Sequence, residues 1–345
     1  MIGPDRGVHG GISALVNSYY EAGLQQKVEL KYIGTMKEGS KLKKLMVAGL
    51  ACLDFMHLLR WCDIVHVNCS SDSSFMRKSI FIRYAKKHGK KVLLHQHGGD
   101  FVNYYNAEIS EKRRSYIREI LDMTDLMIVL TDSWKAFFGK LTDPGKIHVL
   151  PNGVVTTSVH RDDGTKKDMN KILFLGRICE AKGVKELIES VIQLHYDNNN
   201  VRLYIGGIFE DNKFLKDIEE NSTFIKHIGW VTGKDKEKYL DECGIMAVPS
   251  YFEGFGLSVV EGMLHGCCVV ASNVGGIPDI IENEIDGLLI KPRDVHELKN
   301  SIERVMKDKN LADKLSCNGE KKVRDKYSIE KITDQLLCYY QQILG

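Results

Sequence analysis

The 345-residue sequence contains little proline and no long apolar segment. It has 6 prolines against 31 glycines, which rules out a Pro-rich linker and leaves room for many tight turns. The longest apolar run, residues 45–59, is interrupted by Asp54 and His57 and is shorter than the roughly 20 residues that span a bilayer. We find no internal repeat or low-complexity tract, and we expect no signal peptide. These absences exclude a membrane-spanning or repeat protein, and the length suits two globular domains.

The sequence also lacks the signatures of disulfide frameworks and metal sites. Its nine cysteines, an odd number, show no Cys-x-x-Cys pair and no regular spacing, and Cys267 and Cys268 lie inside an apolar run. We therefore expect free, buried thiols in a reducing cytoplasm. No Asp-x-Asp motif occurs, and His95 and His97 have no third ligand at a suitable spacing, so we expect no bound metal.

Charge is nearly balanced overall but uneven along the chain. The formal net charge is +2. Residues 1–150 carry 22 Lys and Arg against 15 Asp and Glu, a net +7, whereas the remainder carries 26 against 31, a net −5. A basic N-terminal half indicates attraction to an anionic surface or substrate. The alternative is that these charges belong to solvated helix faces.

Short β-rich segments alternate with helical stretches. In the first half these segments lie at residues 63–67, 91–95 and 126–130, and they are continuously apolar. Continuous apolar residues are typical of parallel strands buried on both faces, and strand–helix alternation predicts a doubly wound α/β sheet. Only two residues, Met1 and Ile2, precede Gly3-Pro4, so few residues are available for a first strand before the Gly10-Gly11 turn. Either the first strand is very short, or Met1 lies within a longer reading frame.

The alternation restarts after Pro151-Asn152-Gly153. Residues 160–170 are polar and are interpreted as a surface linker. Further strands are predicted at residues 171–176, 201–205, 245–248, 268–271 and 288–290. The sequence therefore predicts two Rossmann-like domains, residues 1–150 and 151–328, that face each other across a crevice. Ligands bind such sheets at the carboxyl ends of the strands.

A glycine-rich turn between two carboxylates follows the predicted strand at residues 245–248. Glu253 precedes the turn, and Glu261 lies in the helix that the turn opens. Free N–H groups at a helix N-terminus bind phosphate, and Gly254 and Gly256 allow the backbone to approach it closely. Glu253 can accept hydrogen bonds from sugar hydroxyls, and Glu261 from a ribose. The alternative is an exposed helix start with ordinary acidic residues.

Three other segments follow predicted strands or precede predicted helices. Arg177 and Lys182 lie in one loop after the strand at residues 171–176 and are expected to converge on two phosphates. The Gly10-Gly11 turn, which can also be purely structural, precedes a helix predicted at residues 13–22 and can bring N–H groups to a diphosphate. His97 can hydrogen-bond a sugar hydroxyl or stabilise positive charge near an anomeric carbon.

Together these segments resemble the family-4 retaining glycosyltransferases of the GT-B fold, over nearly the whole chain. The matching motifs, in order, are Gly10-Gly11-Ile12, His97-Gly98-Gly99-Asp100, Pro151-Asn152-Gly153-Val154, Gly176-Arg177 with Lys182-Gly183, the Glu-x7-Glu of Glu253 and Glu261, and Gly275-Gly276-Ile277-Pro278-Asp279. The Glu-x7-Glu motif combined with the Arg/Lys pair is the specific part. The last motif ends in Asp279, where the family usually has Glu.

The resemblance implies an activity and a division of roles. A hexosyltransferase-type enzyme would move a sugar, with retention, from a nucleoside-diphosphate donor to an acceptor hydroxyl, without a metal or other cofactor. Residues 1–150 would form the acceptor-side domain, residues 151–328 would bind the nucleotide-sugar, and a last helix at about 329–345 would pack back on the first domain. The implied catalytic residues are Arg177, Lys182, His97 and Glu253, and the implied substrate-binding residues are Gly10, Gly11, Gly229, Phe255, Gly256, Leu257, Ser258 and Glu261.

Two other functions stay open: a nucleotide-sugar epimerase of the same fold and a non-catalytic nucleotide-sugar-binding subunit. A Rossmann dehydrogenase is excluded because residues 7–11 do not supply Gly-x-Gly-x-x-Gly. The sequence names neither sugar nor base, since backbone contacts to a base leave no side-chain signature. We expect a UDP-sugar donor and a saccharide or lipid-linked acceptor in cell-surface polysaccharide or glycolipid synthesis. We expect no nucleic-acid partner.

Residues 41–50 combine basic and apolar side chains. Lys41, Lys43 and Lys44 precede an apolar run in the basic half, and each basic residue near an anionic leaflet contributes about 1 kcal/mol. This pattern favours peripheral contact of a cytoplasmic protein with the inner membrane face. The alternative is that the apolar residues of the segment pack onto the sheet, namely Leu42, Leu45, Met46 and Leu50.

Overall fold

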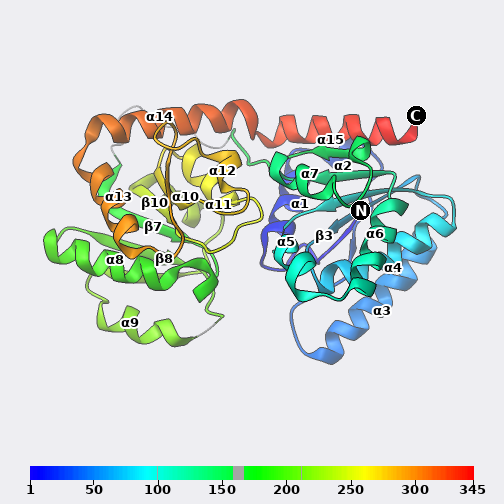
Figure 1. Cartoon of the computed structure of the whole chain (residues 1–345), viewed down its shortest axis with the longest axis horizontal. Helices are drawn as coiled ribbons and strands as arrows, with labels where there is room; N and C mark the ends of the chain where they lie inside the picture. Colours follow the sequence, from blue (N-terminus) through cyan, green and yellow to red (C-terminus); the bar gives the residue numbers. More distant parts are fainter. Residues whose placement is uncertain (99, 158–166, 211) are drawn as a thin grey trace. The chain divides into compact units, whose positions relative to one another are not determined.

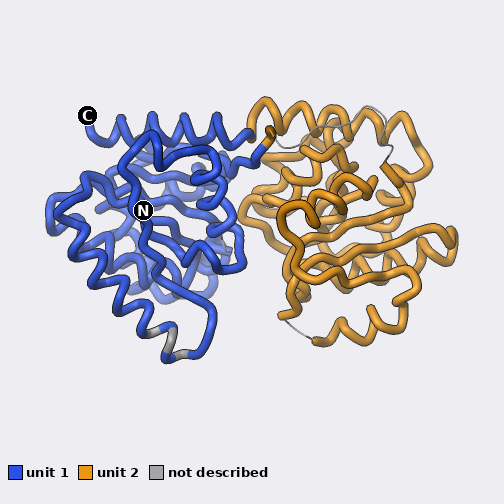
Figure 2. Tube along the Cα trace, turned by 180° about the vertical axis from the view of Figure 1, so that it is seen from behind, with its two compact units in different colours: residues 1–155, 328–345 blue, residues 156–327 orange. Residues whose placement is uncertain are grey.

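The computed structural model describes residues 1–98, 100–157, 167–210 and 212–345, and the side chains of residues 41, 43 and 45 lie outside this description. The chain forms two compact units (Figure 2). The first joins Met1–Val155 to Ser328–Gly345, and the second comprises Thr156–Tyr327. No helix of the described part is both long and apolar enough to cross a bilayer.

The first unit contains a six-stranded parallel sheet with the order β2-β1-β3-β4-β5-β6 (Figure 1). Its strands are β1 (Ile2–Gly3), β2 (Ile33–Gly34), β3 (Ile64–Cys69), β4 (Lys91–Gln96), β5 (Leu126–Val129) and β6 (Ile147–Val149). Its α-helices are α1 (Gly11–Glu21), α2 (Leu24–Lys27), α3 (Lys41–Leu58), α4 (Ser73–Lys87), α5 (Phe101–Asn103), α6 (Glu111–Met123), α7 (Asp132–Phe138) and α15 (Ile329–Leu344). A π-helical turn at Tyr104–Glu108 follows α5, and a 3-10 turn at Pro144–Lys146 precedes β6.

The second unit contains another six-stranded parallel sheet, with the order β12-β11-β10-β7-β8-β9. Its strands are β7 (Asp168–Leu175), β8 (Arg202–Gly206), β9 (Ile225–Gly229), β10 (Cys243–Val248), β11 (Cys268–Ser272) and β12 (Leu288–Ile290). Its α-helices are α8 (Val184–Asp197), α9 (Leu215–Glu220), α10 (Gly233–Glu242), α11 (Leu257–Leu264), α12 (Ile277–Ile280), α13 (Val295–Lys307) and α14 (Lys309–Lys326). Short 3-10 turns lie at Glu180–Lys182 and Asn212–Phe214.

The apolar strands form these sheets because helices cover both of their faces. All four residues of β5 and all six of β10 are buried. Parallel neighbours need a crossover connection, and helices supply most of them. In the second unit, Leu187 and Val191 of α8 share one buried cluster with Leu203 and Ile205 of β8. The predicted α/β class with two doubly wound sheets is confirmed.

The last helix of the chain, α15, belongs to the core of the first unit (Figure 1). Its Ile332, Leu336 and Tyr340 share a buried cluster with Leu15 and Tyr19 of α1. The chain returns to this unit beside residues 153–155, where the Ile329 amide donates to the Val154 carbonyl (2.9 Å). The C-terminal residues thus complete the core of the first sheet.

Each sheet reverses its strand order next to its first strand. In the second unit the chain runs from β7 to β8 and β9 on one side, and β10 then lies on the other side of β7. In the first unit β2 and β3 lie on opposite sides of β1. Loops that leave the carboxyl ends of strands at such a reversal are where open α/β sheets bind ligands. The loops after β7 and β10, and after β1 and β3, are therefore the first places to look for a site.

Several predicted elements need correction. β7 starts at Asp168, which pairs with Cys243, so residues 168–170 are not linker. Polar residues are tolerated there because the beginning of the strand is only partly buried. The rest of the predicted linker, up to residue 166, lies outside the described residues. The strands β2, β6 and β9 were not predicted, and β1 comprises the two residues Ile2–Gly3.

None of the nine cysteines, all of which are described, forms a disulfide bond. The expectation that they are buried is wrong for Cys52, Cys317 and Cys338, which are exposed. These three cysteines lie on the outer faces of α3, α14 and α15. Their neighbours in the sequence are apolar, and this composition does not show which face of a helix is packed.

Candidate active site

Two loops of the second unit lie side by side at the reversal of its sheet. One follows β7 over residues 176–183, and the other follows β10 over residues 249–256. The Tyr251 amide donates to the Ala181 carbonyl (2.9 Å). Gly183 has a φ of +66°, and a Cβ there would lie 2.0 Å from the Pro249 carbonyl oxygen, so only glycine permits this approach. Local packing therefore brings the two predicted phosphate-binding motifs together.

Lys182 and Glu253 form a mostly buried ion pair between these loops. Lys182 Nζ lies 2.5 Å from Glu253 Oε1, and the two side chains are 17% and 15% exposed. The Ser250 hydroxyl donates to the same carboxylate oxygen (2.9 Å). Removing one partner of such a pair leaves the other charge poorly solvated, so the pair holds both groups in one place.

Arg177 lies on the same loop as Lys182 but pairs with a different carboxylate. Its Nη1 donates to Glu210, which follows β8, and both side chains are largely exposed. The backbone supports this contact, since the Glu210 amide donates to the Ile178 carbonyl (3.1 Å). Sequence reasoning expected Arg177 and Lys182 to converge on one ligand. In the structure Arg177 pairs with Glu210 and Lys182 pairs with Glu253.

The helix α11 begins at a glycine turn beside the ion pair. Gly256 is its N-cap residue, with a φ of +99°, and no side chain of the described part caps the helix. The first turn contains Leu257 and Ser258. Unpaired N–H groups and the positive end of the helix dipole stabilise an anion at such a terminus. The second motif thus supplies backbone donors next to Lys182.

The Gly275-Gly276 turn fixes the backbone of Glu253. The Gly276 amide donates to the Glu253 carbonyl (3.0 Å). Gly275 has a φ of +55°, and a Cβ there would lie 1.8 Å from the same oxygen. The Gly275-Gly276 motif therefore positions the loop that contains Glu253.

The other predicted residues of this cluster differ in accessibility. Glu261, in the second turn of α11, forms an ion pair with Lys236 of α10, with 2.7 Å between Oε1 and Nζ. Phe255 is 4% exposed and packs edge-on against Tyr327, with 5.9 Å between ring centroids. The Phe255 side chain is therefore part of the core, and only its backbone is available to a ligand.

Gly229 ends β9 and borders open space. Its φ is +72°, and a Cβ would meet no atom within 4 Å. The backbone conformation, and not crowding, therefore favours glycine here. The Gly229 carbonyl accepts from the Gly207 amide (2.8 Å), and His227 Nε2 lies 2.8 Å from the Gly207 carbonyl oxygen.

In the first unit, Gly10 and Gly11 lie exposed where the loop after β1 enters α1. Gly10 is the N-cap residue, its backbone is extended, and no side chain of the described part caps this helix. A Cβ at either glycine would meet nothing within 4 Å. Neither glycine is thus required by contacts within the unit, which leaves the helix N-terminus open to a close approach from outside.

His97 follows β4 and ends a buried chain of polar side chains. Its Nε2 lies 2.7 Å from Asn68 Oδ1, and its ring packs against that of His95 at a tilt of 35°, with 3.9 Å between centroids. His95 Nδ1 lies 3.3 Å from His66 Nε2, and His66 Nδ1 lies 2.6 Å from the Tyr340 hydroxyl. Despite these three histidines, no set of three or more His, Cys, Asp or Glu side chains in the described ranges is arranged to hold a metal ion.

Asn68 determines which nitrogen of His97 carries the proton. The Asn68 amide nitrogen donates to the Ile2 carbonyl (3.2 Å), so its oxygen faces His97 and accepts from Nε2–H. Burial, reinforced by His95, His66 and Lys78, holds the pKa of His97 well below its ordinary value, and the ring is neutral. His97 Nδ1 is then a buried acceptor, and it has no partner among the described residues. It can accept a hydrogen bond from a ligand hydroxyl.

Sequence reasoning missed the partners of the predicted residues. Glu210, Lys236, Ser250 and Asn68 hold Arg177, Glu261, Glu253 and His97, respectively. Ser250 stood next to a recognised turn and was the easiest to find. The other three lie 25 to 33 residues from the groups they contact, and no motif marks them.

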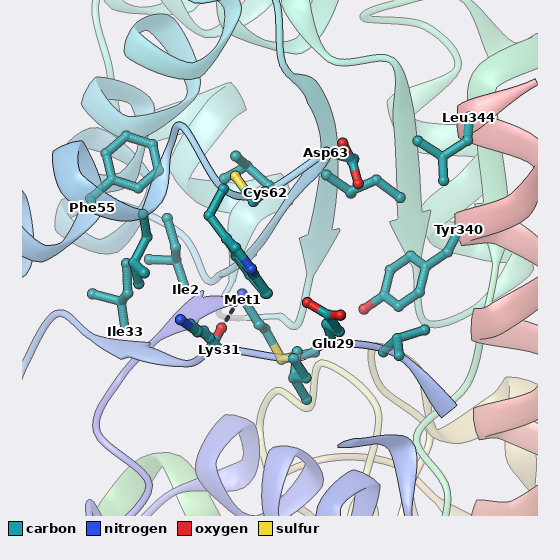
Figure 3. Close-up of a pocket in the computed structure, with 16 residues that line it drawn as sticks. Met1, Ile2, Glu29, Lys31, Ile33, Phe55, Cys62, Asp63, Tyr340 and Leu344 are labelled. Carbon is teal, nitrogen blue, oxygen red and sulfur yellow. Dashed lines mark hydrogen bonds between the residues drawn. The ribbon is translucent and has the colours of Figure 1, made fainter. Parts of the chain in front are cut away.

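A cavity of about 440 Å³ in the first unit lies away from these residues (Figure 3). Met1, Ile2, Ile33 and Asp63 line it, together with Phe55 on the inner side of α3. The Met1 amine donates to the Lys31 carbonyl inside it (2.7 Å), and burial lowers the pKa of that amine to about 6. These residues belong to the amino ends of β1, β2 and β3. Gly10, Gly11 and His97 follow the carboxyl ends of their strands, so the cavity is not part of the candidate site.

Comparison with known proteins adds family information to this geometry. Residues 156–322 match the family described as glycosyl transferases group 1, and residues 33–158 match glycosyltransferase family 4. An uncharacterized glycosyltransferase of Methanocaldococcus jannaschii is 29% identical over 216 residues, which are 58% of this chain and 55% of that protein.

A second relative and a solved structure extend the comparison. The UDP-Gal:alpha-D-GlcNAc-diphosphoundecaprenol alpha-1,3-galactosyltransferase of Escherichia coli is 26% identical over 57% of this chain and 54% of its own length. The matches thus span little more than half the length of these two curated relatives. The sucrose-phosphate synthase of Thermosynechococcus elongatus superimposes with a TM-score of 0.81 at 20% identity, over 99% of this chain and 98% of that one. This similarity shows the GT-B fold.

Proposed function

The chain belongs to the family-4, group 1 glycosyltransferases, and we propose that it transfers a sugar, with retention and without a metal ion, from a nucleoside-diphosphate donor to an acceptor hydroxyl. In this proposal the second unit binds the donor, and the first unit binds the acceptor and contributes Gly10, Gly11 and His97. The transferred group is a hexose-type sugar.

The observation that carries the proposal is the place of Lys182. Its ammonium group is mostly buried, and loop packing that requires Gly183 holds it beside the uncapped N-terminus of α11. A fixed cation and a set of backbone donors at the reversal of a parallel sheet form a binding site for a diphosphate. Glu253 holds the ammonium in place until the phosphate oxygens replace it as partners.

The chemistry follows from where charge develops. When the bond between the anomeric carbon and the phosphate oxygen breaks, negative charge builds up on the departing diphosphate. Lys182, Arg177 and the amides of Leu257 and Ser258 are preorganised donors for that charge, and electrostatic stabilisation of this kind usually lowers an enzymatic barrier more than any other single effect. The acceptor oxygen then bonds to the anomeric carbon from the face that the diphosphate leaves. Its proton passes to the leaving phosphate oxygen, so no protein base is needed.

Glu253 and Glu261 orient the donor in this scheme. Glu261 accepts hydrogen bonds from the ribose, after exchange with Lys236, and the backbone around Gly229 lies against the base. Glu253 accepts from hydroxyls of the donor sugar. His97 of the first unit is neutral, so its Nδ1 can accept a hydrogen bond from a substrate hydroxyl without adding positive charge.

The substrates are inferred from relatives. The E. coli relative is named for a UDP-sugar donor and a diphosphoundecaprenol-linked acceptor. We infer a UDP-sugar donor and a saccharide or lipid-linked acceptor for this chain, in polysaccharide or glycolipid synthesis at the cytoplasmic side of the membrane. No cofactor or nucleic acid takes part.

The proposal is tested by measuring nucleoside diphosphate release from UDP-glucose, UDP-galactose and UDP-N-acetylglucosamine. Each donor is incubated with and without GlcNAc-diphosphoundecaprenol or short saccharides. Acceptor-dependent release of UDP, with an α-linked product from an α-linked donor, is the expected result. Conversion of the donor to its epimer without acceptor would replace the transferase with an epimerase. Binding of donor without turnover on any acceptor would indicate a non-catalytic binding subunit.

A further inference from the structure

The outward face of α3 in the first unit is apolar. It carries five large apolar side chains, Leu42, Met46, Leu50, Leu53 and Met56, which are 69%, 59%, 59%, 60% and 43% exposed, respectively. Steps of four, four, three and three residues place them on one stripe along the helix. The alternative that Leu42, Met46 and Leu50 pack onto the sheet is wrong, and the side chain of Leu45 lies outside the described residues.

The opposite face of α3 makes the packing contacts. Ala51 and Phe55 are buried, and Phe55 packs edge-on against Phe81 of α4 with 5.0 Å between centroids. The helix is thus apolar on two faces and uses one of them for the core. In Figure 1, α3 forms an outer margin of the first unit, and the exposed side chains of its second face are open to solvent. Monomeric proteins rarely leave a contiguous apolar stripe of this length in water.

The charges around the stripe are mainly basic. Residues 36–61 contain five Lys and Arg against two Asp and Glu. The exposed Lys44 lies in the first turn of α3, and the exposed Arg60 lies just beyond its last turn. The acidic residues are Glu38 in the loop before α3 and Asp54 on the helix. Because both ends of the helix are basic, a second copy laid along it in either direction would bring like charges together.

We propose that this face of α3 docks on an anionic phospholipid surface, with the stripe inserted at the level of the headgroups and Lys44 and Arg60 paired with lipid phosphates. An interfacial helix needs an apolar face for insertion and basic residues for anionic lipids, and α3 has both. This surface does not rest on the proposed sugar transfer, since vesicle binding is measured without substrate.

The test is flotation with vesicles of phosphatidylcholine alone or with about 30% phosphatidylglycerol, at about 50 mM and about 500 mM NaCl. The wild type is expected to bind the anionic vesicles at low salt and to be released at high salt. Leu53→Ser should lower the partition coefficient about tenfold. Lys44→Gln with Arg60→Gln should lower it about 30-fold. The matched control is Tyr196→Ser, at an exposed position on α8 in the second unit, which should bind like the wild type.

Three results would overturn the proposal. The first is absence of wild-type binding to anionic vesicles at low salt. The second is equal loss of binding in Leu53→Ser and Tyr196→Ser. The third is a wild-type dimer, seen by sedimentation velocity, that Leu53→Ser dissociates while vesicle binding is absent, which would make the stripe a self-interface. Circular dichroism and the thermal midpoint verify that each variant is folded, as expected for exposed positions.

Discussion

Replacing Lys182 with alanine should affect both stability and turnover, and the two effects can be separated. The Lys182–Glu253 pair is mostly buried, so removal of the ammonium leaves a poorly solvated carboxylate that keeps the Ser250 hydroxyl as a hydrogen-bond donor. We expect the free energy of unfolding to fall by about 3 kcal/mol. The loss of one preorganised donor to the departing diphosphate should lower kcat about 10²–10³-fold, which corresponds to about 2.7–4 kcal/mol.

The chain offers a matched control for the stability effect. Lys322 pairs with Asp286 in the same unit, and these side chains are 18% and 4% exposed. Lys322→Ala should therefore destabilise the protein about as much as Lys182→Ala, because it also leaves a buried carboxylate without its cation. Lys322 lies on α14 and donates to the Ile280 carbonyl (2.6 Å), outside the candidate site. Its removal should leave kcat of the folded enzyme unchanged.

The assay combines urea unfolding, followed by circular dichroism, with initial rates of UDP release at saturating donor, at a temperature where both variants remain folded. A kcat for Lys182→Ala close to that of the wild type would refute the role of this lysine. An equal fall in kcat for Lys322→Ala would show that turnover follows stability and not charge at the diphosphate.

Three further predictions concern the carboxylates proposed to contact the donor, the metal dependence of turnover and the stability of the protein in acid. Glu261→Ala should weaken UDP binding in calorimetry, whereas Glu253→Ala should mainly reduce discrimination between donor sugars; equal losses of UDP affinity would contradict this division. Turnover should persist in EDTA, and its complete loss, restored by Mn²⁺ or Mg²⁺, would show that the reaction needs a metal. Burial lowers the pKa of His95 to about 3 and those of His66 and His97 well below 6.5, so the unfolded state binds more protons than the folded state below pH 6.5. Stability should therefore be full above that pH and fall by about 1.4 kcal/mol per pH unit for each histidine below it; urea midpoints that do not change between about pH 7.5 and 5.5 would exclude this linkage.

The central strands could be predicted from the sequence because they are buried on both faces. β5 and β11 read as continuous apolar runs with turn residues around them. The edge strands β2 and β9 gave no such signal. β2 has two residues, and β9 carries exposed Lys226 and His227, so neither shows an apolar period. Pairing with a neighbour, and not local composition, makes them strands.

The candidate site was predictable where glycines mark the backbone. Gly183, Gly256 and Gly275 have positive φ angles, and Gly183 and Gly275 also allow close contact between loops. The motifs around these glycines are local in the sequence, so they could be recognised from it. The carboxylates that hold the cations are not local. Glu210 meets Arg177 only because the loops after β7 and β8 are adjacent in the sheet. The spacing of these residues in the sequence does not predict that contact.

The sequence of α3 could not show which face of this helix packs against the core, for a related reason. Leucine, methionine and phenylalanine occur on both faces of the helix, so periodicity does not reveal which face is packed. Burial of Phe55 and exposure of Leu53, two residues apart, settle the orientation. The same composition fits a core helix and a helix at a surface.

The central claim, that the loops after β7 and β10 bind a nucleoside diphosphate, is tested most directly by calorimetric titration of UDP, GDP, ADP and their sugar conjugates. The wild type and Lys322→Ala should bind one diphosphate series with the same affinity. Lys182→Ala should bind that series more weakly by a factor of ten or more, as expected for a lost charge-assisted contact worth about 1.5–3 kcal/mol. Failure of every nucleotide to bind the wild type, or equal affinity in Lys182→Ala, would contradict the account.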